Sequence, residues 1–194
     1  MNSDSIHAYL SDTARTLAAL ADGCATDVAK AASLVTDAVR AGGKLLICGN
    51  GGSAADAQGL ATEFVSTLTT DRRRPAIPAI ALTTDTSILT AIANDFGFDG
   101  VFARQVEAIG RGGDVLLGIS TSGNSGDVLL AVEEARRRRL STIALTGATG
   151  GHLVGLVDVA IRVPSEETSH IQEAHLAVEH ALAFAVENEL YPLD

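Results

Sequence analysis

The sequence has no tryptophan and only one methionine, and aromatic residues make up 4% of its 194 positions. The two cysteines, Cys24 and Cys48, are too few and too widely spaced for a disulfide framework or a cluster of thiolate metal ligands. No uncharged apolar run approaches the roughly 18 residues of a membrane-spanning helix. The first residues form neither a basic nor an apolar leader, so we expect a cytoplasmic protein with no membrane partner.

Basic residues are also in deficit. Lys and Arg number 14 against 24 Asp and Glu, and the formal net charge of -10 disfavours direct binding to nucleic acid. Two arginine runs, 72–74 and 136–139, are the exceptions, and each is either a phosphate patch or, more simply, a solvated loop or helix end. With 46% hydrophobic and 20% charged residues, the composition is that of one globular domain with an aliphatic core that includes Cys48.

The spacing of apolar residues changes along the chain. Residues 6–40 have apolar positions three and four residues apart, which predicts two helices that meet near Gly23. Five short apolar runs, each typical of a strand buried on both faces, follow at 44–49, 79–82, 114–119, 141–145 and 158–163. Helical segments are expected at 53–68, 86–93 with 100–109, 125–138, a short stretch at 150–156, and 167–190.

This alternation predicts an α/β fold, a three-layer doubly wound sheet of five parallel strands with an added N-terminal helical segment. We expect one domain over 1–194, with the helical segment at 1–40, the α/β core at 44–163 and a closing helix at 167–190. In such a sheet, ligands bind beyond the carboxyl ends of the strands, where the strand order reverses.

Four of the expected strands end in loops rich in Gly, Ser, Thr and Asn. These loops are Gly49 to Ser53, Thr83 to Ser87, Ser120 to Ser125 and Thr146 to Gly151. Glycine lets backbone N–H groups approach an anion, hydroxyl groups donate hydrogen bonds, and a helix N-terminus adds partial positive charge. One such loop is as readily explained by helix capping, but several at one sheet edge predict a phosphate site.

Three other motifs fit the sequence less well. No Gly-Lys-Ser/Thr occurs, which argues against a Walker loop. Gly49 to Ala54 fits a relaxed dinucleotide-binding pattern, which requires an acidic residue about 20 positions further along, at the end of the second strand. The acidic residue at that place is Asp85, which lies 34 residues after Gly51 and is therefore too far away. Gly118 to Ser122 lacks the last glycine of a serine hydrolase elbow.

Several segments together resemble the phosphoheptose isomerases of the SIS (sugar isomerase) family. They are Cys48 to Gln58, Ala81 to Ser87, Ala93 to Asp95, Gly118 to Ser125, Val163 to Ser165 and Ile171 to His175. The resemblance implies a flavodoxin-like SIS domain, conversion of sedoheptulose 7-phosphate to D-glycero-D-manno-heptose 7-phosphate in heptose biosynthesis, and a homotetramer with sites between subunits. It implies substrate-binding roles for Asn50, Gly51, Gly52, Ser53, Glu63, Asn94, Asp95, Ser120, Thr121, Ser122, Ser125 and Gln172.

The same resemblance implies catalytic roles for Glu63 and His180, and a zinc ion bound by Glu63, Gln172 and His180. Ketose–aldose exchange moves a proton between adjacent carbons through an enediol, so it needs a base and an acid. Glu63 is the expected base and His180 the expected acid. Without the resemblance, His180 on an Ala- and Val-rich helix would be a packed structural histidine, and Glu63 a surface carboxylate.

The sequence departs from this family at Gly59, where the family has a histidine four residues before the helix glutamate. Glycine supplies no ligand and costs a helix roughly 1 kcal/mol relative to alanine. With three ligands left, we expect the zinc to be weakly bound or absent. His170 is a substitute in principle, although a solvated histidine at a helix start is the simpler interpretation.

A second function from a different class also fits the sequence. Close relatives that have lost catalytic residues are tetrameric SIS-domain proteins that bind the bacterial replication initiator, and others sense a sugar phosphate. The presence of Glu63 and His180 in this chain favours the enzyme.

Overall fold

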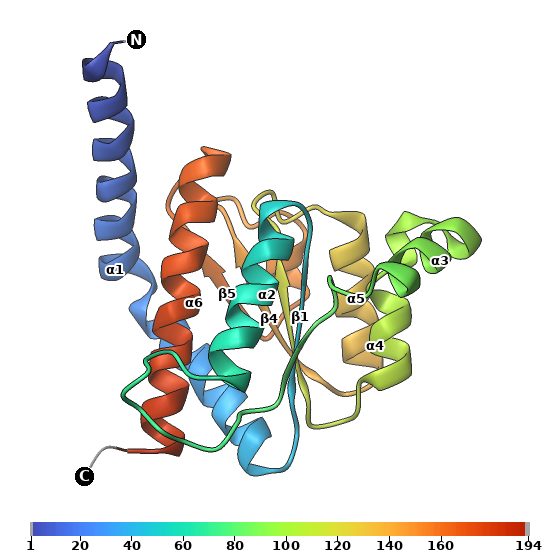
Figure 1. Cartoon of the computed structure of the whole chain (residues 1–194). Helices are drawn as coiled ribbons and strands as arrows, with labels where there is room; N and C mark the ends of the chain where they lie inside the picture. The colour runs from blue at the N-terminus through green and yellow to red at the C-terminus, as the bar shows by residue number, and fades with distance from the viewer. Residues whose placement is uncertain (1, 193–194) are drawn as a thin grey trace.

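The computed structural model describes residues 2–192 and consists of one sheet with helices on both faces (Figure 1). The parallel strands are β1 (Leu45–Gly49), β2 (Ala79–Ala81), β3 (Val115–Ile119), β4 (Ser141–Thr146) and β5 (Val159–Arg162). They lie in the order β2-β1-β3-β4-β5, which is the flavodoxin-like order. The predicted doubly wound α/β fold with five parallel strands is therefore confirmed.

Helices form the two outer layers (Figure 1). One face of the sheet carries α1 (Ser3–Arg40), α2 (Gly52–Val65) and α6 (Thr168–Leu190), and the other carries α3 (Thr86–Phe96), α4 (Ala103–Ile109) and α5 (Gly126–Arg137). Short 3-10 helices, η1 (Phe98–Gly100) and η2 (Leu153–Gly155), lie in the connections. None of the helices between residues 2 and 192 combines the length and apolar character needed to span a bilayer.

The sheet is covered by one apolar core on each face. In β1, Leu45 and Ile47 belong to the core under α1, α2 and α6, whereas Leu46 and Cys48 belong to the core under α3, α4 and α5. Alternate side chains of a strand point to opposite faces, so a continuous apolar run is what a strand buried on both faces requires. The prediction that Cys48 is a core residue is confirmed.

The N-terminal segment is one helix, and the prediction of two was wrong. α1 continues through Gly23, where an added Cβ would meet no atom within 4 Å. An interior glycine costs a helix about 1 kcal/mol, and the packing of α1 along α6 and β5 outweighs that cost. A single glycine therefore does not end a long helix that is supported by its neighbours.

Two smaller predictions also need correction. The helix expected at 150–156 is reduced to the three residues of η2. The second and fifth strands are not buried on both faces, because β2 and β5 are the edges of the sheet; Ile80 is 41% exposed, and Arg162 is also exposed.

In the arginine run 72–74, Arg72 and Arg74 form neither a phosphate patch nor a solvated loop, whereas Arg73 is exposed. Arg74 Nε donates to Glu187 Oε1 at 2.7 Å, and the side chains of Arg74 and Glu187 are only 1% and 2% exposed. Arg74 also donates to the backbone carbonyls of Glu63 and Phe64, and Arg72 donates to the carbonyl of Glu187. The buried Arg74–Glu187 pair therefore holds the loop between α2 and β2 against the C-terminal part of α6.

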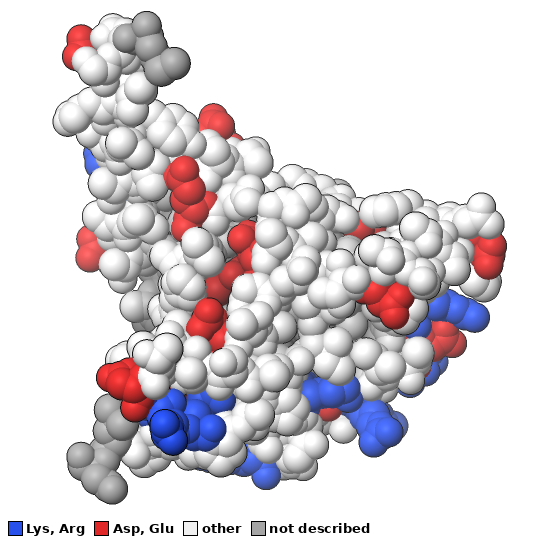
Figure 2. Space-filling view, in the orientation of Figure 1, with Lys and Arg blue, Asp and Glu red and all other residues white. Residues whose placement is uncertain are grey.

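Most basic side chains visible in Figure 2 gather at the end of the molecule where the strands begin. The run 136–139 follows this pattern at the end of α5, where Arg137 and Arg138 form ion pairs with Glu134. The interpretation of this run as a helix end is confirmed. At the opposite end, where the strands stop, the view shows few blue atoms.

Candidate active site

The loops after β1 and β3 lie side by side where the strand order reverses. β1 and β3 are adjacent, with Gly49 opposite Ile119, while β2 lies on the other side of β1. A Cβ on Gly49 would lie 3.0 Å from the Ile119 carbonyl oxygen and 2.8 Å from Ser53 Cβ, so this close approach requires glycine. The loops predicted to bind phosphate therefore meet at the switch point of the sheet. Ser53 itself is 6% exposed and packs beneath the turn.

Three serine hydroxyl groups gather in the loop after β3. Ser120 Oγ lies 2.9 Å from Ser125 Oγ and 3.5 Å from Ser122 Oγ. Ser125 immediately precedes α5, a helix of 12 residues, and its hydroxyl group makes no capping hydrogen bond to that helix. The first N–H groups of a helix have no intrahelical partner and carry partial positive charge. Hydroxyl groups and free N–H groups together suit a phosphate.

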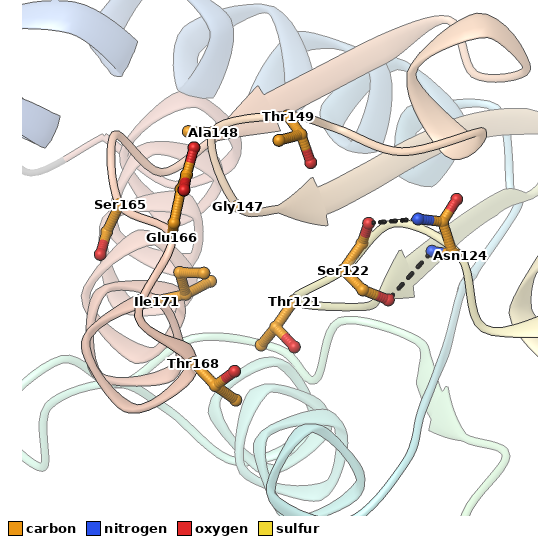
Figure 3. Close-up of a pocket in the computed structure, with 10 residues that line it drawn as sticks. All are labelled: Thr121, Ser122, Asn124, Gly147, Ala148, Thr149, Ser165, Glu166, Thr168 and Ile171. Carbon is orange, nitrogen blue, oxygen red and sulfur yellow. Dashed lines mark hydrogen bonds between the residues drawn. The ribbon is translucent and has the colours of Figure 1, made fainter.

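A cavity of about 310 Å³ opens beside this loop (Figure 3). The loops after β3 and β4 and the start of α6 form its walls, and five lining residues carry hydroxyl groups, namely Thr121, Ser122, Thr149, Ser165 and Thr168. Glu166 is the one charged side chain among the lining residues. The cavity therefore offers many neutral hydrogen-bonding groups, as a sugar ligand needs.

Gln172 of α6 reaches the first turn of α2. A Cβ on Gly52 would lie 1.7 Å from Gln172 Nε2, so the absence of a side chain at Gly52 is what allows the amide to lie there. Gln172 also lines a second cavity, again of about 310 Å³, together with Asp56 and Ser169. The structure thus brings together Gly52 and Gln172, two of the residues predicted to bind substrate.

Glu63, Gln172 and His180 do not come together in one chain. Glu63 is half-buried on α2 and His180 is exposed on α6. Gln172 lies at Gly52, eleven residues before Glu63, which corresponds to about 16 Å along a helix. The ligands of one zinc ion lie about 2 Å from the metal, so this separation is too large for a shared ion.

The position of Gly59 adds no ligand. It lies one turn before Glu63, and a Cβ there would meet no atom within 4 Å. Within residues 2–192, no three His, Cys, Asp or Glu side chains are placed to hold a metal ion. Because glutamine is not among those residue types, it is the separation of Gln172 from Glu63 that keeps a single chain from forming the zinc site implied by the resemblance.

His170 is not the solvated histidine that the sequence predicted. It is 8% exposed, and its Nδ1 lies 3.0 Å from Thr13 Oγ1 and 3.2 Å from Glu173 Oε2. Its ring centroid lies 4.6 Å from that of Tyr9. These contacts join α1 to α6, so His170 has a packing role and does not replace the ligand missing at Gly59.

Asn94 and Asp95 lie near the end of α3, and both are exposed. Asn94 Nδ2 donates to Asp95 Oδ1 at 2.8 Å, and no hydrogen bond in the described chain joins either side chain to the loops after β1 and β3. Both side chains therefore face solvent in a single chain.

Two buried carboxyl groups near the site were not predicted from the sequence. Asp127, 3% exposed at the start of α5, accepts hydrogen bonds from Asn50 Nδ2 at 3.0 Å and from the Val128 N–H at 2.9 Å. Glu179 of α6 is 1% exposed, and neither of its oxygens has a partner in the described chain. Burial, and secondly the nearby Asp56, raise the pKa of Glu179 to about 8.

Helical spacing alone could have indicated that Glu179 lies on the same face of α6 as Gln172. Glu179 lies seven residues after Gln172, which places the two within about 20° of one another around the helix. His180 lies about 80° away, and it is exposed where Glu179 is buried. The helix face that carries Gln172 therefore continues to Glu179 rather than to His180.

Comparison with known proteins agrees with this geometry. A family model described as "SIS domain" matches residues 8–147. The chain is 51% identical to a phosphoheptose isomerase of Rhodospirillum rubrum over 187 residues, which cover 96% of this chain and 98% of the relative. Solved phosphoheptose isomerase structures from Neisseria gonorrhoeae (42% identity, TM-score 0.90) and Francisella tularensis (38% identity, TM-score 0.92) cover 96% and 97% of this chain. The match covers 98% and 100% of those two structures.

Proposed function

Because the chain belongs to the phosphoheptose isomerases of the SIS domain family, we propose that it converts sedoheptulose 7-phosphate to D-glycero-D-manno-heptose 7-phosphate. The observation that carries the proposal is the serine cluster of the loop after β3, at the switch point of the sheet. Ser120, Ser122 and Ser125 bind the phosphate group, and the carbon chain extends toward Gln172. This places the reacting end of the sugar near the first turns of α2 and α6.

The proposed reaction moves one proton between two adjacent carbons. Glu63 removes a proton from the carbon next to the carbonyl group while His180 donates a proton to the carbonyl oxygen, which gives an enediol. Glu63 then returns its proton to the former carbonyl carbon, and His180 takes back a proton from the hydroxyl group of the other carbon. Gln172 orients the sugar oxygens. Because Glu63 and Gln172 lie about 16 Å apart along one chain, they come from different copies of the chain in this proposal, at a site between subunits. We assign no step to a metal ion, because the ligands that the resemblance implies lie apart in a single chain.

A second copy of the chain completes the site in this proposal. Asn94 and Asp95 are exposed on α3 beside Phe96 and Phe98, which are 62% and 59% exposed. Neighbouring aromatic side chains this exposed are typical of a protein interface. We infer a homotetramer of about 80 kDa, four times the subunit mass of 19.9 kDa. Light scattering that gives the subunit mass at micromolar protein would contradict it.

A thermal-shift experiment paired with an isomerase assay tests the proposed function. Sedoheptulose 7-phosphate should be turned over and should raise the melting temperature, whereas unphosphorylated sedoheptulose should have little effect. Changing Ser120→Ala together with Ser122→Ala should remove the shift. Glu63→Gln should abolish turnover but keep the shift, because it alters only the proposed base. Equal shifts with both sugars would contradict the assignment of the loop after β3.

The second candidate is a non-catalytic SIS-domain protein that binds a sugar phosphate or the bacterial replication initiator. It is favoured by Gly59, which leaves the zinc site implied by the resemblance without one ligand. The thermal shift and the turnover assay together separate the two functions. A sugar-phosphate shift without detectable turnover would support the non-catalytic protein.

A further inference from the structure

Asn50, in the turn after β1, is held by a buried carboxylate. Its Nδ2 donates to Asp127 Oδ1 at 3.0 Å. The same oxygen accepts the Val128 N–H at 2.9 Å, and Asp127 is 3% exposed. The contact joins the loop after β1 to the helix after β3, so it connects the two sides of the proposed site.

This contact fixes which end of the Asn50 amide faces the ligand. Asp127 Oδ1 already accepts the Val128 N–H, so it acts as an acceptor, and the atom of Asn50 that faces it is the nitrogen. The Asn50 Oδ1 then points away from Asp127, and it accepts no hydrogen bond from a side chain of the described chain. The first N–H groups of α2, which follow directly, are donors. Asn50 therefore places one acceptor in a turn that otherwise offers donors.

We propose that Asp127 is a positioning residue, which turns Asn50 so that its Oδ1 accepts a hydrogen bond from a sugar hydroxyl group. The inference rests on the proposed function and adds to it a source of specificity. An amide oxygen accepts a hydrogen bond from a sugar hydroxyl group, whereas inorganic phosphate held by the serine loop has no carbon chain to bring a hydroxyl group to Asn50. The Asn50–Asp127 pair therefore selects a polyhydroxy phosphate over inorganic phosphate.

A purely structural role for Asp127 makes a different prediction. An acidic residue in the first turn of a helix favours the helix through its dipole, and Asp127 also accepts the adjacent Val128 N–H. If stabilising the start of α5 were the whole role of Asp127, removing its side chain would lower the affinity for all ligands alike, whether or not Asn50 is present. If Asp127 acts through Asn50, its loss has no further effect once the Asn50 amide is removed.

Calorimetric titration with sedoheptulose 7-phosphate and with inorganic phosphate separates these roles. Asp127→Ala should lower the affinity for the sugar phosphate roughly 10-fold, as expected for the loss of one hydrogen bond, and should leave the affinity for inorganic phosphate unchanged. Asp127→Asn should recover most of the affinity, because its Oδ1 can accept both hydrogen bonds and the Val128 N–H holds its amide in that orientation. Asn50→Ala should match Asp127→Ala, and the double variant should be no weaker than Asn50→Ala.

Each contrary outcome is distinct. The proposal is overturned by any of three results. These are that Asp127→Ala leaves the affinity for the sugar phosphate unchanged, lowers the affinity for inorganic phosphate equally, or further lowers the affinity of the Asn50→Ala protein for the sugar phosphate. Wild-type protein that binds no sugar phosphate at all would overturn the proposed function together with this inference. If Asp127→Ala does not fold, Asp127→Ser takes its place, because serine keeps a polar helix start but is too short to reach Asn50.

Discussion

Glu179 should make the protein less stable as the pH rises through the neutral range. Its side chain is 1% exposed and its oxygens have no partner in the described chain. Burial, and then the nearby Asp56, raise its pKa from 4.5 to about 8. Between these two values the unfolded chain holds fewer protons than the folded one, so folding stability falls as pH rises. The contribution of neutral Glu179 to folding stability is fully present below about pH 4.5 and is lost as the pH rises to about 8.

The magnitude follows from the same two values. A rise in pKa from 4.5 to about 8 corresponds to a ceiling of about 5 kcal/mol, and relaxation around the charged form lowers it to a few kcal/mol. Glu179→Gln keeps the shape of the side chain and stays neutral at every pH. The free energy of unfolding of this variant, relative to wild type, should therefore grow by a few kcal/mol between pH 5 and pH 8.

Urea unfolding of both proteins at pH 5, 6.5 and 8 measures this difference. EDTA and equal protein concentrations are needed, because metal binding and subunit association change apparent stability. Glu173→Gln is the matched control, since Glu173 is exposed on the same helix and a hydrogen bond from Thr13 lowers its pKa. A difference between Glu179→Gln and wild type that does not change with pH would refute the assignment of Glu179 as a buried neutral acid.

Three further substitutions have definite expected results. Gly59→Ala should raise the free energy of unfolding by up to about 1 kcal/mol, since the added Cβ lies inside α2 and meets no atom within 4 Å; a loss of stability in urea would contradict this. Arg74→Ala should cost up to about 3–5 kcal/mol in the same assay, because it leaves the buried charge of Glu187 with only the more distant Arg72, at 3.9 Å, and a cost below about 1 kcal/mol would argue against the pair. Gly52→Ala should displace the Gln172 amide and raise KM for the sugar phosphate while the protein still folds, whereas an unchanged KM would show that Gln172 does not contact the ligand.

The sequence predicted the fold well because the signals for its elements are local. Each strand is a short apolar run, and the helix pattern of α5 begins directly after the polar run that ends at Ser125. Gly23 wrongly suggested a break between two helices, because a glycine ends a helix only when no neighbouring element supports it. The edge position of β2 was missed since strand order does not follow from the strand's own residues.

The candidate site was predictable only where its chemistry is local. The Gly-, Ser- and Asn-rich loops stand out in the sequence, and their meeting at one edge follows from the parallel sheet. Asp127 and Glu179 did not stand out, because a carboxylate on a helix is ordinary until another element covers it. Arg74 was misjudged for the same reason, since its partner Glu187 lies 113 residues further along the chain. Whether a charged side chain is buried depends on the tertiary packing, and the neighbouring residues in the sequence do not reveal it.

The absence of basic side chains from the lining of the cavity beside the serine loop has a consequence for how salt affects binding. Its lining residues include Glu166 but neither lysine nor arginine, and the whole chain carries a formal charge of -10. A phosphorylated sugar is therefore repelled at long range and attracted only at contact, through hydroxyl and N–H groups. Added salt screens that repulsion, over a Debye length of about 8 Å at physiological ionic strength, and leaves the short-range hydrogen bonds in place. Affinity should hold level or increase as ionic strength rises, the reverse of a phosphate site built from arginine side chains.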